Sequence, residues 1–330
     1  MSFYTELSPQ RHLDMFVRAF AGSKRARRLH RRAQANGQAI GTGLQVIRKR
    51  WPDAASRSTA EPIFIFSAGW RSGSTLLQRL VAASTDIFMW GEPYRRAALI
   101  EGLADQVRAF NESWPQDRYF VERFDLENLS EQWVANLYPS MDDFIAAHVC
   151  YFECLFERPL AALGKSRWGA KEVTLGVDYA RYLKWLFPRA RFLFLVRNPW
   201  SAWRSYRQWA QWYRSWPSEP VFTPTAFGRL WSELADDFRR NHGDVDGLLL
   251  RYEDLFDRQT LASIAKYLQT EIVDPAGMSR IDRHAGMEGA GVKRYVPRIE
   301  QYLLKRQVGN DASRFGYQPE MPAQRRLSSV

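Results

Sequence analysis

The chain has 330 residues, of which 45% are hydrophobic and 25% are charged, a balance typical of a globular protein with one large domain, or one domain and an extension. No apolar run approaches the roughly 18 residues that a membrane span needs. The first residues also lack the apolar core of a secretory signal, so we expect neither feature in this chain.

The net charge of +11 is unevenly distributed. Ten basic residues and no acidic residue lie between Asp14 and Asp53: Arg18, Lys24, Arg25, Arg27, Arg28, Arg31, Arg32, Arg48, Lys49 and Arg50. The rest of the chain is close to neutral, so the positive charge belongs to the N-terminal segment. We therefore divide the chain into a basic helical extension with its linker, residues 1–60, and a main domain, residues 61–330.

Apolar residues in the basic extension recur with helix-like spacing: Met15, Phe16, Phe20 and Leu29. One interpretation is a helix that rests on an anionic membrane surface or on a polyanionic acceptor, peripheral at the membrane. The other is a solvated helix that packs on the main domain through its apolar stripe. Nothing else in the chain supports nucleic-acid binding, so no nucleic-acid partner is expected.

Residues 63–80, IFIFSAGWRSGSTLLQRL, predict a strand, a tight loop and a helix. The first four residues form an apolar run typical of a buried strand. Gly69 and Gly73 bracket the loop, and an amphipathic helix opens at Ser74. A loop that delivers a helix N-terminus is an anion site, because free N–H groups and the helix dipole point at one spot.

This loop differs from the common nucleotide-binding motif. A Walker A sequence needs a lysine directly before Ser or Thr, after its second glycine. Here Gly73 is followed by Ser74 and Thr75, and the cation, Arg71, precedes the glycine. An ordinary ATP or GTP site is therefore disfavoured, while the Ser72, Ser74 and Thr75 hydroxyls still suit a phosphate-type ligand.

Strands and helices alternate beyond this stretch, which predicts an α/β fold with a P-loop-like parallel sheet flanked by helices. Further strands are expected over DIFMW before Gly91-Glu92-Pro93, over RWGAKEV, and over residues 191–196 and 247–252. Helices are expected from residue 140 onward and over residues 178–187, 200–216, 223–242 and 261–268. From residue 272 the pattern weakens.

A second anion site is predicted at the end of the strand RFLFLV. Arg197 ends this strand, and Ser205 follows eight residues later on the next helix. Arginine gives bidentate contacts to phosphate and the serine adds one hydrogen bond. The alternative is that Arg197 is a structural ion-pair residue. Two anion sites on one sheet suggest a ligand with two separate phosphate-like ends.

Two cysteines, Cys150 and Cys154, lie one helical turn apart near His148. Together the three could bind a metal, but two reduced core cysteines are the simpler interpretation. We follow the simpler interpretation, and it predicts a cytoplasmic protein without a metal site.

Four segments, AGWRSGSTLL, KEVTL, LFPRARFLFLVRNPWSAWRS and LLLRYEDL, occur in this order over residues 61–270. They resemble the motif series of sulfotransferases that use 3′-phosphoadenosine 5′-phosphosulfate (PAPS). The resemblance is closest to the carbohydrate and tyrosylprotein branch and its bacterial relatives. It implies transfer of a sulfuryl group from PAPS, as co-substrate, to an acceptor hydroxyl. Because sulfate monoesters carry less charge than phosphates and no acidic metal cluster is apparent in the sequence, we expect no metal.

The resemblance also implies residue roles. The loop would hold the 5′-phosphosulfate through Arg71, Ser72, Gly73, Ser74 and Thr75. Arg197 and Ser205 would hold the 3′-phosphate, and Tyr252 would lie against the nucleotide, its alternative being a core tyrosine. Lys171 matches the lysine that touches the transferring sulfuryl group, its alternative being a surface lysine. Lys293 matches a late basic residue that closes over the nucleotide.

Sulfuryl transfer also needs a group that accepts the proton of the attacking hydroxyl. Many cytosolic relatives use a histidine two residues after the matching lysine, but here that position is Val173. Glu92 is the better candidate, because it ends a strand at the carboxyl edge, where ligands of open α/β sheets bind. The alternative is that Glu92 only pairs with Arg95 or Arg96. Glu172 is the reserve candidate for the base.

Acceptor recognition is harder to predict. Trp209, Trp212, Tyr213 and Trp216 share one helical face, which suits either stacking on a sugar or core packing, and Trp70 is an exposed candidate in the loop. We predict a saccharide or glycolipid acceptor. The alternative functions are a nucleotide-dependent kinase-like phosphotransferase and a non-catalytic polyanion-binding protein. The missing Walker lysine opposes the first, and the presence of Glu92 and Lys171 opposes the second.

Overall fold

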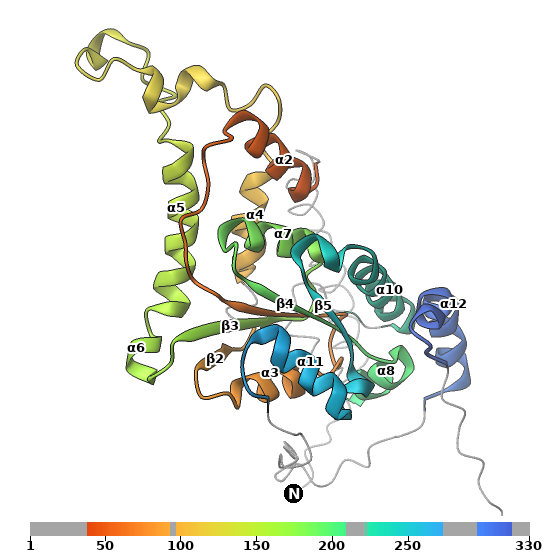
Figure 1. Cartoon of the computed structure of the whole chain (residues 1–330). Helices are drawn as coiled ribbons and strands as arrows, with labels where there is room; N and C mark the ends of the chain where they lie inside the picture. Colours follow the sequence, from red (N-terminus) through yellow and green to blue (C-terminus); the bar gives the residue numbers. More distant parts are fainter. Residues whose placement is uncertain (1–37, 93–96, 209–220, 222, 273–295, 319–330) are drawn as a thin grey trace, which may run out of the picture. The chain divides into compact units, whose positions relative to one another are not determined.

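The computed structural model describes residues 38–92, 97–208, 221, 223–272 and 296–318 (Figure 1). The chain forms two compact units. The first comprises Met1–Ala55, Tyr94–Ala146 and Gln211–Val221, and the second comprises Ser56–Pro93, Ala147–Ala210 and Phe222–Val330. Residues 1–37 lie outside the described residues, so the division at residue 60 stays a prediction.

The first unit is helical. It contains α2 (Ile40–Arg50), α4 (Leu99–Val107), short 3₁₀ turns at Asp117–Tyr119, Val121–Arg123 and Leu129–Glu131, and the start of α5 (Met141–Phe152). Helix α2 packs so closely on α4 that a Cβ at Gly43 would lie 2.2 Å from the Val107 carbonyl oxygen. Arg50, at the end of the predicted basic segment, forms an ion pair of 2.5 Å with Asp117. The sequence did not predict that the basic N-terminal segment and the segment Tyr94–Ala146 belong to one unit.

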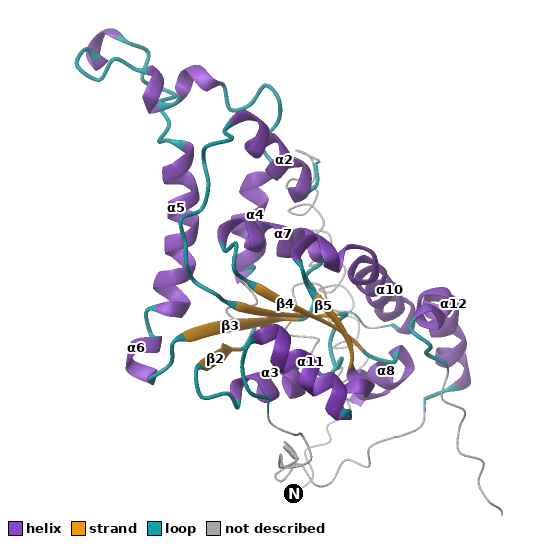
Figure 2. Ribbon diagram, viewed as in Figure 1, coloured by secondary structure: helices purple, strands orange, loops and turns teal. Residues whose placement is uncertain are grey.

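The second unit is built on a sheet of five parallel strands in the order β2-β3-β1-β4-β5 (Figure 2). The strands are β1 (Ile63–Ser67), β2 (Ile87–Trp90), β3 (Arg167–Glu172), β4 (Arg191–Val196) and β5 (Leu248–Arg251). Because all strands run the same way, their carboxyl ends share one edge of the sheet. The predicted parallel α/β sheet is therefore confirmed.

The two faces of the sheet differ in composition, because side chains alternate along each strand. One face is aliphatic and includes Ile65, which packs in a core cluster with α3 (Ser74–Ala82) and α11 (Arg258–Leu268). The other face is aromatic: Phe64 stacks on Phe192 with ring centroids 5.4 Å apart. Helices α7 (Val177–Leu186) and α10 (Pro224–Asn241) cover this face.

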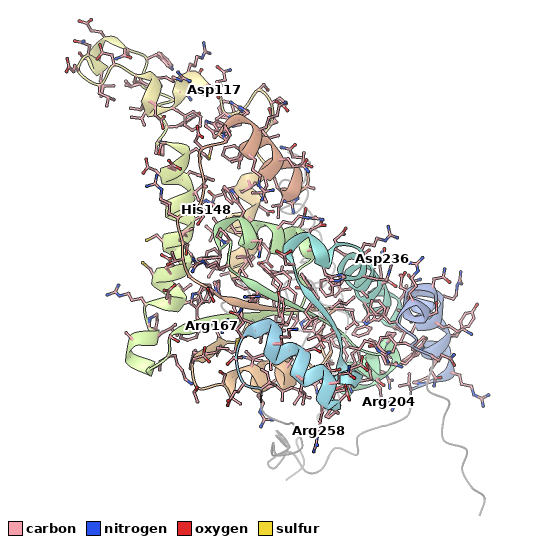
Figure 3. All side chains as sticks on the ribbon, viewed as in Figure 1. Asp117, His148, Arg167, Arg204, Asp236 and Arg258 are labelled. Atoms are coloured by element: carbon pink, nitrogen blue, oxygen red, sulfur yellow. The ribbon has the colours of Figure 1, made fainter. Side chains whose placement is uncertain are left out.

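The aromatic face also contacts the chain that follows α5, which contains a π-helical turn at Glu153–Glu157 and then α6 (Leu160–Leu163). The ring of Phe156 stacks on Trp168 of β3, with centroids 5.3 Å apart. His148, labelled in Figure 3, is 5% exposed, and its Nδ1 lies 2.6 Å from the hydroxyl of Tyr182. Burial lowers the pKa of His148 to about 4.

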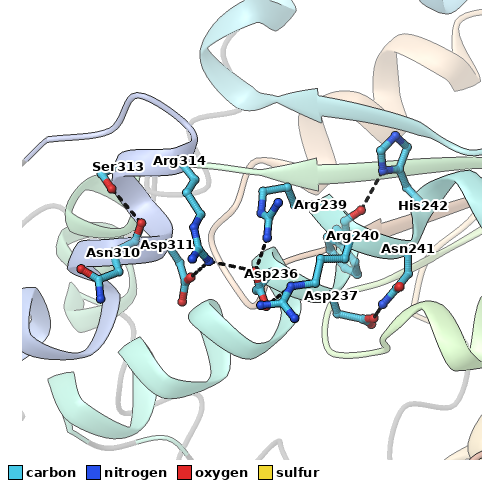
Figure 4. Close-up of polar contacts among 11 residues, drawn as sticks. Asp236, Asp237, Arg239, Arg240, Asn241, His242, Asn310, Asp311, Ser313 and Arg314 are labelled. Atoms are coloured by element: carbon cyan, nitrogen blue, oxygen red, sulfur yellow. Dashed lines mark hydrogen bonds and ion pairs between the residues drawn. The ribbon is translucent and has the colours of Figure 1, made fainter.

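The remaining helices of this unit are α8 (Pro199–Gln208) and α12 (Arg298–Arg314). The sequence did not predict α12, because its buried stripe is only Leu304, Val308 and Ala312. An ion pair to α10 holds it as well: Arg314 of α12 lies 3.2 Å from Asp236 of α10, which also pairs with Arg239 and Arg240 of its own helix at 2.8 Å each (Figure 4). Polar contacts therefore add to the limited apolar packing that attaches α12 to α10.

Candidate active site

The loop between β1 and α3 has an unusual backbone. Gly69, Arg71 and Gly73 adopt left-handed conformations, with φ of 81°, 62° and 91°. A non-glycine residue pays roughly 1–3 kcal/mol for such a conformation, which persists mostly at functional sites. The Ser72 hydroxyl donates to the Gly69 carbonyl at 2.9 Å and braces the turn from inside. The loop is therefore a fixed cradle in front of the α3 N-terminus.

Gly73 is also required by a close approach of Tyr252, which follows β5. A Cβ at Gly73 would lie 2.0 Å from Cδ2 of the tyrosine ring. The guanidinium carbon of Arg197 lies 4.1 Å from the centroid of the same ring. The ends of β1, β4 and β5 thus meet at one point, with the Tyr252 ring between the loop and a cation.

Arg71 joins the two predicted anion sites. Its Nε donates to the Ser205 hydroxyl of α8 at 2.8 Å. The Arg197 guanidinium in turn donates to the carbonyl oxygen of Arg71 at 2.9 Å. The structure therefore brings Arg71, Ser205, Arg197 and Tyr252 together as one cluster, rather than as two separated sites.

Lys171 and Glu92 form an ion pair at the carboxyl ends of β3 and β2, on the same edge of the sheet. The Lys171 side chain is 7% exposed and that of Glu92 is 22% exposed. The backbone N–H of Lys171 also donates to the Gly91 carbonyl at 3.2 Å, which ties the two strand ends together. The alternative of a surface lysine at residue 171 is wrong, because this residue is buried.

Glu172 lies on the other side of the sheet. In the register of β3 with β1, Lys171 lies opposite Ile65 on the aliphatic face, whereas Glu172 lies opposite Phe66 on the aromatic face. Because neighbouring residues of a strand point to opposite faces, Glu172 is directed away from the side that carries α3.

Among the described residues, no group of three or more His, Cys, Asp and Glu side chains is arranged to hold a metal ion. Over the same residues, no helix is long and apolar enough to cross a bilayer.

The comparison with protein families gives one match, to a model described as the sulfotransferase family, over residues 62–274. This match covers more than half of the chain. The chain belongs to the sulfotransferase family. The described residue pairs, Lys171 with Glu92 and Arg71 with Ser205, all lie inside the matched range.

Solved structures with a similar fold include three sulfotransferases. The sulfotransferase domain of the curacin biosynthetic pathway is 14% identical, with a TM-score of 0.41, and the match covers 78% of this chain and 98% of that domain. A sulfotransferase from Alicyclobacillus acidocaldarius is 17% identical, with a TM-score of 0.42. The match covers 79% of this chain and 98% of that chain. Mouse sulfotransferase SULT7A1 complexed with PAP is 14% identical, with a TM-score of 0.38. The match covers 84% of this chain and 92% of the mouse chain. No curated protein matches the chain. The family assignment rests on the match of the sequence to the family model, because structural similarity with such low TM-scores and identities does not support one.

Two predictions about the sulfotransferase are wrong. Trp70 is not an exposed acceptor contact: it is 6% exposed and packs on the Tyr206 ring of α8, with centroids 5.8 Å apart. Cys150 and Cys154 are free thiols but are exposed, not part of the core. Cys150 lies near the end of α5 and Cys154 in the π-helical turn that follows it.

Lys293 and the aromatic stripe lie outside the described residues; the stripe consists of Trp209, Trp212, Tyr213 and Trp216. Their roles stay predictions, as does pairing of Glu92 with Arg95 or Arg96.

The structure adds positioning residues that the sequence did not suggest. Gln78 of α3 donates from Nε2 to the carbonyls of Met89 and Trp90, at 3.2 and 3.1 Å, and so fixes the end of β2. A long amide side chain on a helix gives no sequence signal for such a role. Its partners are backbone atoms of a strand that only the tertiary fold brings near.

A second positioning network fixes the ends of β4 and β5. Glu253 accepts the Asn198 backbone N–H at 3.1 Å and the Tyr317 hydroxyl at 2.7 Å. Burial, together with the bond to Glu253, raises the pKa of Tyr317, so this phenol stays protonated as a donor. Tyr317 lies beyond the family match, and no motif marked it.

Proposed function

We propose that this sulfotransferase transfers a sulfuryl group from PAPS to an acceptor hydroxyl, with Glu92 as the base. The main support for this proposal is the ion pair of Glu92 with Lys171, which lies at the same edge of the sheet as the loop that contains Arg71. A cation and a carboxylate at one strand edge suit a reaction that moves a proton while negative charge shifts between oxygens.

The residues present fit a nucleotide with two anionic ends. The N-terminus of α3 offers backbone N–H groups, since the first turn of a helix lacks intrahelical acceptors. Arg71 and Arg197 add two cations within the cluster that includes Ser205. The Tyr252 ring supplies a flat surface beside them. PAPS, when bound, would supply the activated sulfuryl group.

We assign the nucleotide-holding roles accordingly. The loop from Arg71 to Thr75 would bind the 5′-phosphosulfate through backbone N–H groups and side chains. Arg197 and Ser205 would bind the 3′-phosphate, which requires the Ser205 hydroxyl to exchange its bond with Arg71 for one with the ligand. Lys293, outside the described residues, is proposed to add a further cation.

Glu92 and Lys171 would carry the chemistry. Glu92 accepts the proton of the acceptor hydroxyl as that oxygen attacks sulfur in line with the leaving phosphate. Lys171, whose cation lies against Glu92, stabilises charge on the sulfuryl oxygens and on the leaving oxygen, and Arg71 contributes to the same charge. The buried position of Lys171 strengthens its electrostatic effect, because less water screens it.

The sheet geometry favours Glu92 over Glu172 as the base. Glu172 is directed to the aromatic face, whereas Lys171 and helix α3 lie on the aliphatic side. A base on the aromatic side would be separated from the loop by the strand itself.

We propose a saccharide or glycolipid as the acceptor, as the branch resemblance implies. A screen with ³⁵S-labelled PAPS over saccharides, lipids and peptides tests this directly. The proposal expects labelled product from at least one hydroxyl acceptor. If no acceptor class is labelled while ATP labels one, the kinase alternative replaces it. Binding of the basic N-terminal extension, residues 1–60, to an anionic membrane surface or a polyanion, and a cytoplasmic location, remain separate predictions.

Nucleotide choice gives a second test. Adenosine 3′,5′-bisphosphate (PAP) should raise the melting temperature, because a ligand that binds only the folded state stabilises it by about 2.7 kcal/mol at a hundred times its Kd. ATP with Mg²⁺ should have little effect. Stabilisation by ATP alone would contradict the assignment, and stabilisation only by long polyanions would favour the non-catalytic alternative.

A further inference from the structure

Cys150, near the end of α5, and Cys154, in the π-helical turn that follows, form an exposed pair of thiols. Their sulfur atoms lie 3.6 Å apart, and neither is in a disulfide. They are the two cysteines of the whole chain. Hydrogen bonding to Cys154 raises the pKa of the Cys150 thiol.

Cys154 lies inside the π-helical turn Glu153–Glu157. This turn contacts β2 and β3, the two strands that lead to Glu92 and Lys171. The indole Nε1 of Trp90 donates to the Phe156 carbonyl at 3.1 Å, and Trp90 precedes Glu92 by two residues. The indole Nε1 of Trp168 donates to the Glu157 carboxylate at 3.3 Å, and Trp168 begins the run to Lys171 on β3. One turn of helix thus supports both partners of the Glu92–Lys171 pair.

We propose that Cys150 and Cys154 are a reversible redox site, which a small-molecule disulfide such as oxidised glutathione closes, and that closure slows sulfuryl transfer. One protein thiolate attacks the glutathione disulfide, forms a mixed disulfide and releases one glutathione. The second protein thiolate then attacks the mixed disulfide and releases the other glutathione. The protein loses two electrons and two protons, and glutathione disulfide is reduced to two thiols.

Closure must deform this turn. Residues one helical turn apart have Cβ atoms about 5–6 Å apart, whereas a disulfide holds them at about 3.5–4.5 Å. The backbone between Cys150 and Cys154 has to tighten, and the π turn is where it can yield, because its hydrogen bonds already span one residue more than in an α-helix. Exposed disulfides under such constraint are readily reduced again, which makes the site reversible.

The tightening would displace the Phe156 carbonyl and the Glu157 carboxylate from their indole partners. The ends of β2 and β3 would then lose part of their support, and Glu92 would move relative to Lys171. Small misplacements of reacting groups cost large factors in rate. We expect closure to lower turnover by about three- to tenfold. This effect on turnover rests on the proposed function, whereas closure itself does not.

Closure is tested by incubating the reduced full-length protein with oxidised glutathione, followed by intact-mass and free-thiol measurement. The expected product is a monomer that has lost both free thiols and two hydrogen masses, and that dithiothreitol restores. Cys150→Ser and Cys154→Ser are the matched controls, because each leaves one thiol that can only form a mixed disulfide or a dimer. Two stable glutathione adducts, or two thiols that stay free, would overturn the redox site.

Coupling is tested on the same samples by turnover and by hydrogen exchange of the peptide that covers Ile87–Glu92. We expect slower turnover and faster exchange in the closed wild type, both reversed by dithiothreitol, and no intramolecular closure in either serine variant. A closed form with unchanged turnover and unchanged exchange would refute the coupling. If the reduced protein shows no sulfuryl transfer at all, the proposed function fails, while the thiol and exchange readouts still decide the redox site.

Discussion

The two ends of the sheet's carboxyl edge use charge in different ways. At β2 and β3, Lys171 meets a carboxylate, Glu92, in a mostly buried ion pair. At β1, β4 and β5, Arg71 donates to the Ser205 hydroxyl, and Arg197 contacts the Arg71 carbonyl and an aromatic ring. The first arrangement pairs a cation with a carboxylate and suits proton movement, whereas the second gathers two cations at the strand ends and suits an incoming anion. Variants at the two ends should therefore separate chemistry from binding.

The largest effect is expected for Glu92→Gln. The amide keeps the shape of the side chain but cannot accept a proton, so turnover should fall by about 10²- to 10⁴-fold. PAP affinity should change by less than about twofold, since Glu92 lies at the other end of the edge. Glu271→Gln, an exposed site, is the control, and near-normal turnover in Glu92→Gln would move the base elsewhere.

Arg197→Ala should give the opposite pattern. Removal of a charge-assisted contact to phosphate costs about 1.5–3 kcal/mol, which is about a 10- to 150-fold loss of PAP affinity by titration calorimetry. Turnover at saturating PAPS should fall much less. Arg189→Ala removes an exposed partner of Glu61 at the amino edge and should leave affinity unchanged. Equal affinity in Arg197→Ala would place the 3′-phosphate elsewhere.

Gly73→Ala probes the contact on which the binding end is built. A methyl group there meets the Tyr252 ring and requires a left-handed backbone, so the free energy of unfolding should fall by about 1–3 kcal/mol. Gly102→Ala is the control, because nothing lies within 4 Å of its added Cβ and alanine is the better helix former. Denaturant unfolding should show a loss for the first variant and no loss for the second.

His148→Phe addresses the aromatic face rather than either end of the edge. Burial lowers the pKa of His148 to about 4, below the value near 6.5 of an unfolded chain. Between these values the unfolded state binds the extra proton, so stability falls as pH drops from about 6.5 to about 4, by up to about 3 kcal/mol from this group. Unfolding curves of His148→Phe should lose this part of the acid dependence. An unchanged pH slope would contradict the assignment.

The smallest effect is expected for Ser205→Ala. One neutral hydrogen bond is worth about 0.5–1.5 kcal/mol, so PAP affinity should fall by about two- to tenfold. Ser263→Ala, at an exposed position of α11, should bind PAP like the wild type. A loss as large as that of Arg197→Ala would mean that the serine, and not the arginine, dominates the binding end.

The sequence predicts β1 and β4 best because they are mostly apolar and buried, and RFLFLV matches β4 residue for residue. It also predicts Lys171 and Glu92 at strand ends, where topology alone brings them to one edge. It does not predict Gln78 or Tyr317, since their partners are distant backbone or carboxylate atoms. Contacts of this kind carry no local pattern.

Exposure was predicted least well. Periodicity reports which residues share a helical face, but not which face the fold buries. The sequence also places Trp70 outside, since it lies in a loop, and the two cysteines in the core, whereas Trp70 is buried and Cys150 and Cys154 are exposed. Helix α12 is not predicted for a related reason, because an ion pair of Arg314 with Asp236 holds part of it and charged residues mask its short apolar stripe.

A crystal structure of the PAP complex tests the central claim most directly. The account predicts the 5′-phosphate at the α3 N-terminus and the 3′-phosphate within hydrogen-bond distance of Arg197 and Ser205. It also predicts that the 5′-phosphate faces the Glu92–Lys171 pair. PAP bound with its two phosphates exchanged, or bound away from this sheet edge, would contradict the division of the edge into a binding end and a chemical end.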